Sequence, residues 1–455
     1  MIKTPVIAIF DVGKTNKKLF LFNEQYQIVF EKTVVLDEIK DEDEFPCEDL
    51  ESLCSFIYDS FREVLSKNEF DIRAVNFSAY GASFVNVGEN GKPIAPLYNY
   101  LKPYPDYLLQ QFYNTYGGEE NFAYQTASPV LGNLNSGMQL YRIKYEKPGL
   151  FQKIKYAFHL PQFLSYLISG GHYSDLTSIG CHTNLWDFQK TKYHDWVSRE
   201  GVQEKLSPVA SSDTTIATTF DKNNFEAGIG LHDSSAALIP YLLNFHEPFV
   251  LISTGTWCIS LNPFNNSTLT RDELKSDCLC YLQYSGKPVK AARLFAGYLH
   301  DEQAKRIADY FQTDAGKYKQ TRFDEEVASR MQKSEQASIR NCAFESREIS
   351  SFSSYEEAYH QLIFDLINQQ TLSTELILEN KKTKRIFVDG GFSKNEIYMN
   401  LLASSFPDME VYAASMAQAT AMGAALIIHQ SWNRNSIPND IITLKYYSIP
   451  HKAIL

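Results

Sequence analysis

Two segments of the chain share one pattern: an apolar run, a short polar turn that contains glycine, and a second apolar run. The first instance consists of Val6–Phe10, the turn Asp11–Asn16 and Leu19–Phe22. The second consists of Phe249–Ile252, the turn Ser253–Thr256 and Trp257–Leu261. Short apolar runs rich in β-branched and aromatic residues predict strands, so each instance predicts two strands joined by a glycine turn.

The repeated turns indicate phosphate binding. Glycine lets a backbone come close to a ligand, and neighbouring N–H groups and hydroxyls can hold phosphate oxygens. Asp11, at the end of the first strand, can hold Mg²⁺ through water, since that ion keeps much of its hydration shell. The alternative is an ordinary hairpin with an Asp-stabilised corner. The candidate phosphate ligands of the first turn are Gly13, Lys14, Thr15 and Asn16.

Other patterns predict the elements between and after the turns. Acidic residues 37–51 predict a solvated loop, which leads into a helix over 53–65. A strand over 73–77 ends in a corner of small residues at 78–83. Apolar spacing predicts helices over 157–168 and 357–378, and Gly170 is a plausible stop for the first of them. A helix rich in Ala and Gly is predicted over 417–428.

Two further glycine-containing segments carry candidate chemistry. Residues 385–388 predict a strand that ends in Asp389–Gly391, and Ser393 is the predicted N-cap of a helix through Leu402. A nucleotide could lie against the bare backbone of the two glycines. In Gly230–Asp233, the carboxylate of Asp233 could accept a proton from a hydroxyl nucleophile. The alternative for residues 389–395 is a purely structural strand–helix turn, and the alternative for Asp233 is an N-cap. Asp11 and Asp233 could also form a glycosidase pair, but their phosphate-type glycine turns argue against it.

Composition narrows the class of protein. The 455 residues suit two large domains, predicted as 1–243 and 244–455. A net charge of −11 argues against partnership with nucleic acid or an anionic membrane. The N-terminus lacks a signal-peptide pattern, no apolar stretch approaches membrane-spanning length, and seven scattered cysteines argue against a disulfide framework. These features predict a cytoplasmic protein.

The order of the motifs carries a family resemblance. Asp-x-Gly-x-Thr comes first, then Gly-Leu-His-Asp, Ser-Thr-Gly-Thr-Trp, Asp-Gly-Gly-x-Ser-x-Asn, and Ala421–Ala425 last. The chain resembles the FGGY carbohydrate kinases of the actin/hexokinase/Hsp70 superfamily over nearly its whole length. Within that family it looks most like the L-rhamnulokinase and L-fuculokinase branch, on residues 160–167, 230–233 and 252–257.

The resemblance implies an α/β fold of two ribonuclease H-like domains with an interdomain cleft, binding ATP, Mg²⁺ and a sugar. It implies that Asp233 is the catalytic base and that Asp11 positions Mg²⁺, with a homodimer as one possible assembly. Around the phosphates it places Gly13, Lys14, Thr15, Thr254, Gly255 and Thr256. It matches Gly390, Gly391 and Asn395 to the adenosine motif, and His232, Gly81 and Ser83 to the sugar site.

Three positions depart from the pattern of that branch. Ser83 replaces an expected carboxylate, Gln139 replaces a lysine, and Leu101–Lys102 stands where an acidic residue is usual.

The function predicted from the ordered motifs is an ATP-dependent kinase of a ketose or deoxyketose, of L-rhamnulose or L-fuculose type. The alternatives are a xylulose, ribulose or polyol kinase of the same family, a chaperone-like ATPase, and a non-catalytic sugar- or nucleotide-binding protein.

Overall fold

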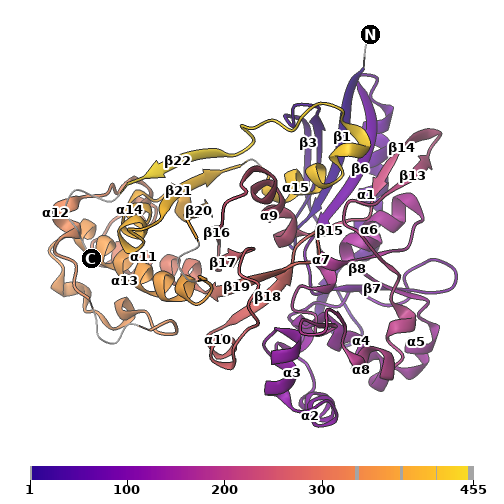
Figure 1. The fold of residues 1–455 in the computed structure, drawn as a ribbon, viewed down its shortest axis with the longest axis horizontal. Helices are drawn as coiled ribbons and strands as arrows, with labels where there is room; N and C mark the ends of the chain where they lie inside the picture. The colour runs from indigo at the N-terminus through magenta and orange to yellow at the C-terminus, as the bar shows by residue number, and fades with distance from the viewer. Residues whose placement is uncertain (1–2, 334–337, 380–382, 417, 449–455) are drawn as a thin grey trace. The chain divides into compact units, whose positions relative to one another are not determined.

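The computed structural model describes residues 3–333, 338–379, 383–416 and 418–448, and the chain divides into two compact units (Figure 1). The first unit contains Met1–Asn244, Cys280–Pro288 and Ala417–Ile441. The second contains Phe245–Leu279, Val289–Met416 and Ile442–Leu455. Two late segments of the chain therefore complete the unit that the N-terminal half begins.

The first unit is built on a seven-stranded sheet. Its order is β13 (Thr215–Phe220), β14 (Asn223–Gly228), β6 (Phe70–Ala79), β1 (Thr4–Val12), β2 (Asn16–Asn23) and β3 (Ile28–Val35), with β15 (Leu231–His232) also paired to β6. Strands β1, β14 and β15 run parallel to β6, whereas β2 runs antiparallel to both β1 and β3. The carboxyl ends of β1, β6 and β15 therefore meet at one edge of the sheet.

Both faces of this sheet are covered, which explains why β1 reads as a continuous apolar run. Side chains alternate along the strand, and Phe10 packs edge-on against Phe56 and Phe61 of helix α1 (Leu50–Ser66). Helix α6 (Leu160–Ser169) belongs to the same hydrophobic cluster. Helices α9 (Asp233–Asn244) and α15 (Ala419–Ile427) lie together on the opposite face, as Figure 1 shows.

Smaller elements complete the first unit. The strands are β4 (Glu38–Lys40), β5 (Pro46–Glu48), β7 (Phe84–Val87), β8 (Tyr156–His159), β9 (Ser174–Asp175), β10 (Trp186–Asp187), β11 (Lys192–Tyr193) and β12 (Val209–Ala210). The helices are α2 (Asp106–Thr115), α3 (Glu119–Thr126), α4 (Ser136–Glu146), α5 (Pro148–Lys153), α7 (Leu176–Ile179), α8 (Asp195–Arg199) and α16 (His429–Trp432).

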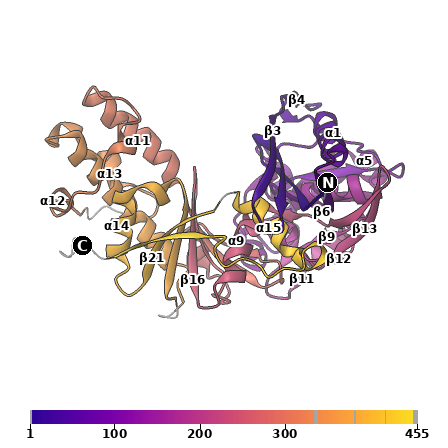
Figure 2. The same cartoon turned by 90° about the horizontal axis from the view of Figure 1, so that it is seen from above.

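A second sheet is built from the second unit, except that residues 280–282 of β18 and Pro288 of β19 belong to the first unit. The sheet order is β18 (Cys278–Leu282), β19 (Pro288–Leu294), β17 (Cys258–Asn262), β16 (Phe249–Thr254), β20 (Arg385–Gly390), β21 (Glu410–Ser415) and β22 (Thr443–Tyr447). The helices are α10 (Arg271–Lys275), α11 (Ala296–Tyr310), α12 (Glu325–Ala328), α13 (Tyr355–Glu375) and α14 (Glu396–Ser405). Figure 2 shows α11, α13 and α14 gathered beside this sheet, where α13 packs against both of the others.

Both predicted strand–turn–strand units are confirmed, because β1 pairs antiparallel with β2 and β16 with β17. Three local predictions are wrong. Residues 37–51 are not a loop throughout: they contain the antiparallel pair β4–β5. Residues 157–159 lie in β8, and the helix begins at Leu160 rather than at Ala157. It ends at Ser169, and Gly170 is its C-cap, as predicted. The N-cap of α14 is Asn395 rather than Ser393, because Asn395 Oδ1 accepts from two backbone N–H groups.

The predicted helix over 417–428 is observed as α15, and Ala417 lies outside the described residues. Within the described ranges, no helix combines the length and the apolar character needed to cross a bilayer.

Candidate active site

The strand topology of the first unit brings Asp11 and Asp233 to one edge of the sheet. Asp11 is the penultimate residue of β1 and lies beside Ser78 of β6, and Asp233 directly follows β15. Because β1 and β15 flank β6 in parallel, their carboxyl ends place both aspartates near the corner at 78–83. Ligands of open parallel sheets characteristically bind at this edge.

Asp11 is held from two sides. The Thr420 hydroxyl of α15 donates to Asp11 Oδ2 at 2.8 Å, and Lys18 lies opposite Asp11 in the β1–β2 register. The pKa of Asp11 is raised to about 6, chiefly by burial and to a smaller extent by the negative charge of Asp233, while Thr420 and Lys18 lower it. A cation near these two carboxylates would relieve their repulsion, so the pair fits Mg²⁺ held through water.

Asp233 begins α9, and its Oδ1 accepts from the backbone N–H of Ser234 at 2.6 Å and from the Ser234 hydroxyl at 3.2 Å. Burial raises the pKa of Asp233 to about 6, although the side chain keeps 31% of its surface exposed. A carboxylate that is ionised at neutral pH, yet close to accepting a proton, suits a general base.

His232 lies between Asp233 and Cys181. Its Nε2 is 3.2 Å from Asp233 Oδ1 and 3.2 Å from Cys181 Sγ. Burial lowers the pKa of His232 to about 4, so the ring is neutral at pH 7. Because a carboxylate only accepts, the contact with Asp233 favours the ring proton on Nε2. Nδ1 is then a buried acceptor without a hydrogen-bond partner among the described residues, which is a group that a ligand hydroxyl can satisfy.

The corner after β6 carries the two other predicted sugar contacts. Gly81 lies against the imidazole of His232, because a Cβ at this position would come within 2.8 Å of the ring. Ser83 is buried, with 2% of its surface exposed. Gln139 donates to Ala82 O at 2.7 Å and to Asn133 O at 2.8 Å, so the residue that replaces the expected lysine holds this corner in place.

The backbone of the first turn is closed by a hydrogen bond from Gly13 N–H to Asn16 O at 2.9 Å. Thr15 and Asn16 are exposed at its tip. Lys14 does not extend freely into solvent: its ammonium lies 2.6 Å from Glu38 and 3.7 Å from Glu48.

The second turn is similar in form. Gly255 N–H donates to Trp257 O at 3.0 Å, and Gly255 and Thr256 are exposed. Thr254 is buried, and its hydroxyl donates to Asp389 O at 2.5 Å and accepts from Phe392 N–H at 3.0 Å. The Thr254 side chain therefore ties the end of β16 to the segment that follows β20.

The Gly390–Gly391 segment is shaped by that tie. Gly390 has a φ of +89°, and a Cβ there would lie 1.9 Å from Thr254 O, so only glycine fits. Gly391 is exposed, and its N–H donates to Thr254 O at 3.0 Å. Asn395 caps α14 through Oδ1 and donates from Nδ2 to Tyr359 OH at 2.8 Å.

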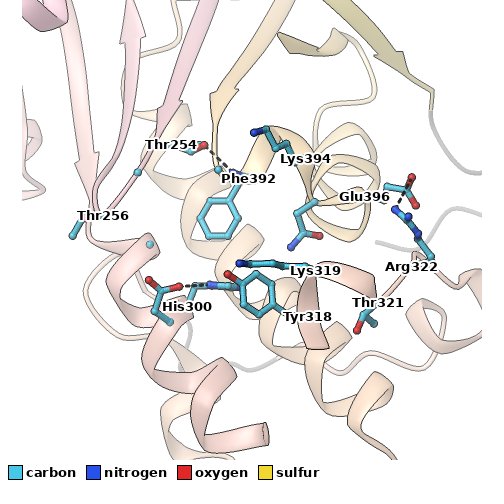
Figure 3. Close-up of a pocket in the computed structure, with 15 residues that line it drawn as sticks. Thr254, Thr256, His300, Tyr318, Lys319, Thr321, Arg322, Phe392, Lys394 and Glu396 are labelled. Carbon is cyan, nitrogen blue, oxygen red and sulfur yellow. Dashed lines mark hydrogen bonds and ion pairs between the residues drawn. The ribbon is translucent and has the colours of Figure 1, made fainter. Parts of the chain in front are cut away.

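These residues line a pocket of about 580 Å³ in the second unit (Figure 3). Predicted residues on its wall are Thr254, Gly255, Thr256, Gly391 and Asn395; Gly390 directly precedes it in sequence. The wall also carries three cationic side chains, those of Lys319, Arg322 and Lys394. Figure 3 shows Arg322 reaching Glu396, at 3.5 Å, at one side of the pocket. The carboxylates of Asp301 and Glu396 also line the pocket, so cationic side chains outnumber anionic ones by three to two. A hollow of this size with an excess of positive charge suits a nucleotide polyphosphate.

Family models match both halves of the chain. The N-terminal domain of the FGGY family of carbohydrate kinases matches residues 6–239, and the C-terminal domain of carbohydrate kinase FGGY matches residues 246–436. The chain belongs to the FGGY family of carbohydrate kinases. The family resemblance read from the motif order is thus confirmed.

A rhamnulokinase of Mannheimia succiniciproducens is 22% identical to this FGGY chain over 288 residues. The match covers 59% of the chain and 55% of the relative, so it spans about half the length of that relative. In three dimensions the chain resembles a carbohydrate kinase of Novosphingobium aromaticivorans, with a TM-score of 0.79 and 20% identity. The match covers 98% of this chain and 95% of that kinase. It also resembles a ligand-bound xylulose kinase of Lactobacillus acidophilus, with a TM-score of 0.79 and 15% identity. That match covers 99% of this chain and 94% of the xylulose kinase. These likenesses confirm the predicted fold class.

The sequence reasoning missed several residues of both sites. In the first unit they are Lys18 and Thr420, which lie beside Asp11, and Cys181, which contacts His232. In the second unit they are the pocket residues His300, Tyr318, Lys319 and Arg322. Lys18 was recognisable, since a hairpin register places it opposite Asp11. The pocket residues after α11 belong to no glycine motif, and only the basic run at 317–322 marks them.

Proposed function

We propose that this protein is an ATP-dependent sugar kinase that transfers the γ-phosphate of ATP to a hydroxyl of a ketose or deoxyketose. The observation that carries the proposal is Asp233, an aspartate of raised pKa beside Asp11 at the carboxyl edge of the first sheet. Membership of the FGGY family supports the reaction class.

In this proposal Asp233 accepts the proton of the sugar hydroxyl as the hydroxyl oxygen attacks the γ-phosphorus and the bond to ADP breaks. Mg²⁺, when bound, neutralises charge on the phosphate oxygens. Asp11 would hold that ion through water. His232 would orient the sugar, because its buried Nδ1 can accept a hydrogen bond from a second hydroxyl. Phosphoryl transfer needs positioning and charge stabilisation more than covalent help, and these residues supply both.

We assign the nucleotide to the pocket of the second unit and the first turn to its terminal phosphates. Lys319, Arg322 and Lys394 supply positive charge there, and Gly391 leaves the wall open to a flat base or ribose. We assign to the phosphates the turn residues Gly13, Lys14, Thr15 and Asn16. Glycine lets the backbone come close to a ligand, and neighbouring N–H groups and hydroxyls can hold phosphate oxygens.

For the acceptor we propose a sugar of L-rhamnulose or L-fuculose type, because the rhamnulokinase relative shares sequence with the chain. Ser83 supplies a neutral hydroxyl where that branch usually has a carboxylate, so contacts with sugar hydroxyls at this corner are weaker. Xylulose, ribulose and polyols are therefore included as competing acceptors in the test.

The test measures ADP release from Mg²⁺-ATP with L-rhamnulose, L-fuculose, L-ribulose, D-xylulose and glycerol, in the wild type and in Asp233→Ala. We expect sugar-dependent ADP release that Asp233→Ala abolishes, while ATP binding by calorimetry is kept. Asp59→Ala removes an exposed aspartate of α1 and serves as the control with normal turnover. Turnover by Asp233→Ala near the wild-type rate would refute the assignment of the base, and binding without ADP release would favour a non-catalytic protein.

A further inference from the structure

Two charged side chains are buried next to the first turn. Lys17, in β2, has 1% of its surface exposed, and Glu48, at the end of β5, has 3%. Lys17 Nζ lies 2.5 Å from Glu48 Oε1 and also donates to Lys14 O, in the turn, at 2.9 Å. Because removing charges from water is costly, a buried pair persists only with good geometry and further hydrogen bonds. Here the further bond goes to the backbone of the turn.

Glu48 also contacts the corner that follows β6. The hydroxyl of Tyr80 donates to Glu48 Oε2 at 3.3 Å. Tyr80 is the first residue after β6, in the corner that carries Gly81 and Ser83, and its N–H donates to Val12 O at 3.1 Å. One carboxylate is therefore bonded both to the turn assigned to phosphate and to the corner assigned to sugar.

The pairing of β4 with β5 explains why both lysines are present. Glu38 and Glu48 lie directly opposite each other in that register, which is unfavourable for like charges. Lys14 lies 2.6 Å from Glu38 and 3.7 Å from Glu48, and Lys17 pairs with Glu48, so the two ammonium groups offset the two carboxylates.

We propose that Glu48 is a positioning residue for phosphate binding. It fixes the Lys14 carbonyl through Lys17 and so holds the backbone of the Gly13–Asn16 turn, and through Tyr80 it couples that turn to the sugar corner. The inference rests on the proposed function, because it requires the turn to receive the terminal phosphates of ATP.

A purely structural role for the pair predicts a different outcome from a positioning role. Replacing a buried ion pair by apolar residues of similar volume is often neutral for stability. The double variant Lys17→Met/Glu48→Leu should therefore fold, with a free energy of unfolding lowered mainly because the Tyr80 hydroxyl loses its acceptor, and it lacks the bond to Lys14 O. Glu48→Gln keeps the shape of the side chain and removes its charge. Glu44→Gln, in an exposed residue of the same β4–β5 segment, is the matched control.

The readout is the affinity of each protein for Mg²⁺-ATP and for AMP, measured by calorimetry. We expect the double variant and Glu48→Gln to bind ATP about tenfold more weakly, the loss typical of one hydrogen bond to a charged group, and to bind AMP within twofold of wild type. AMP lacks the terminal phosphates, so a misplaced turn should weaken the binding of ATP alone. General damage to the fold would weaken the binding of ATP and AMP equally.

An ATP affinity within twofold of wild type in the double variant, or an equal loss for ATP and AMP, overturns the positioning role while leaving the kinase proposal intact. A wild type that binds neither nucleotide refutes the proposed function, and this inference falls with it. If Glu48→Gln does not fold, the double variant alone decides.

Discussion

Asp233→Asn should inactivate the protein and also make it more stable at neutral and alkaline pH. Burial raises the pKa of Asp233 from its usual 3.8 to about 6, which means that the folded protein disfavours the ionised form. In the unfolded chain the Asp233 carboxyl ionises at its usual pKa of 3.8. At any pH above that value, the folded protein therefore loses stability by holding this carboxyl group in its buried site. A neutral Asn amide of nearly the same shape avoids this loss. The Asn carbonyl can still accept from Ser234.

The size of the effect follows from the pKa difference. A shift of one pKa unit corresponds to about 1.4 kcal/mol, so the full cost at pH 8 is about 3 kcal/mol. At pH 5, between the two pKa values, only about 1.5 kcal/mol has developed, and below the unfolded pKa none remains. Because the Asp233 side chain is 31% exposed, solvent screening makes these values upper limits.

Urea unfolding of wild type and Asp233→Asn at pH 5 and pH 8, followed by tryptophan fluorescence, tests this reasoning. The gain in unfolding free energy should be larger at pH 8 than at pH 5, and ADP release should be lost at both. Asp59→Asn, in an aspartate that is 73% exposed, should show no comparable pH-dependent gain. A variant that is less stable than wild type at pH 8, or a gain that does not change with pH, would show that burial does not strain this carboxylate.

Three further outcomes are expected. In the wild type, kcat/KM for the sugar should rise as pH increases through about 6 and level off above it, because Asp233 must be ionised to accept a proton; a profile flat from pH 5 to 8 would contradict this. Thr254→Val should lower the free energy of unfolding by about 1–3 kcal/mol, since it leaves the Phe392 N–H without its acceptor, whereas Thr254→Ser should retain most of the stability in the same urea titration. Asn395→Ala should cost about 1 kcal/mol through loss of the α14 N-cap, and Asn395→Asp should recover most of it; equal losses in both variants would exclude capping as the cause.

The turns that carry the candidate chemistry were predictable because their signals are local. A strand, a glycine corner and a second strand are adjacent in sequence, so the hairpins containing Gly13 and Gly255 follow from the residues themselves. The position of Asp233 after Gly230 likewise marked it as a candidate base. What the sequence does not reveal is that Asp11 and Asp233 share one sheet edge, since that depends on long-range strand pairing.

The acidic segment at 37–51 shows the opposite case. Charged residues usually indicate a solvated loop, and the sequence offers no sign that Glu48 and Lys17 are buried together. The pairing becomes understandable only when β4, β5 and the first turn are seen side by side. The Thr420–Asp11 hydrogen bond, between residues 409 positions apart, was inaccessible to local reasoning for the same reason.

The discontinuous make-up of the first unit has a consequence for how the protein is made. A ribosome delivers the strands β1, β6 and β15 early, but α15, which covers one face of their sheet and supplies Thr420 to Asp11, emerges almost two hundred residues later. Until then that apolar face has α9 but lacks the part of its native cover that α15 supplies, and such surfaces are the ones that aggregate or recruit chaperones during synthesis. An isolated fragment that stops at Asn244 would keep this exposure permanently. The site-bearing unit is therefore completed only after nearly all of the second unit has been translated.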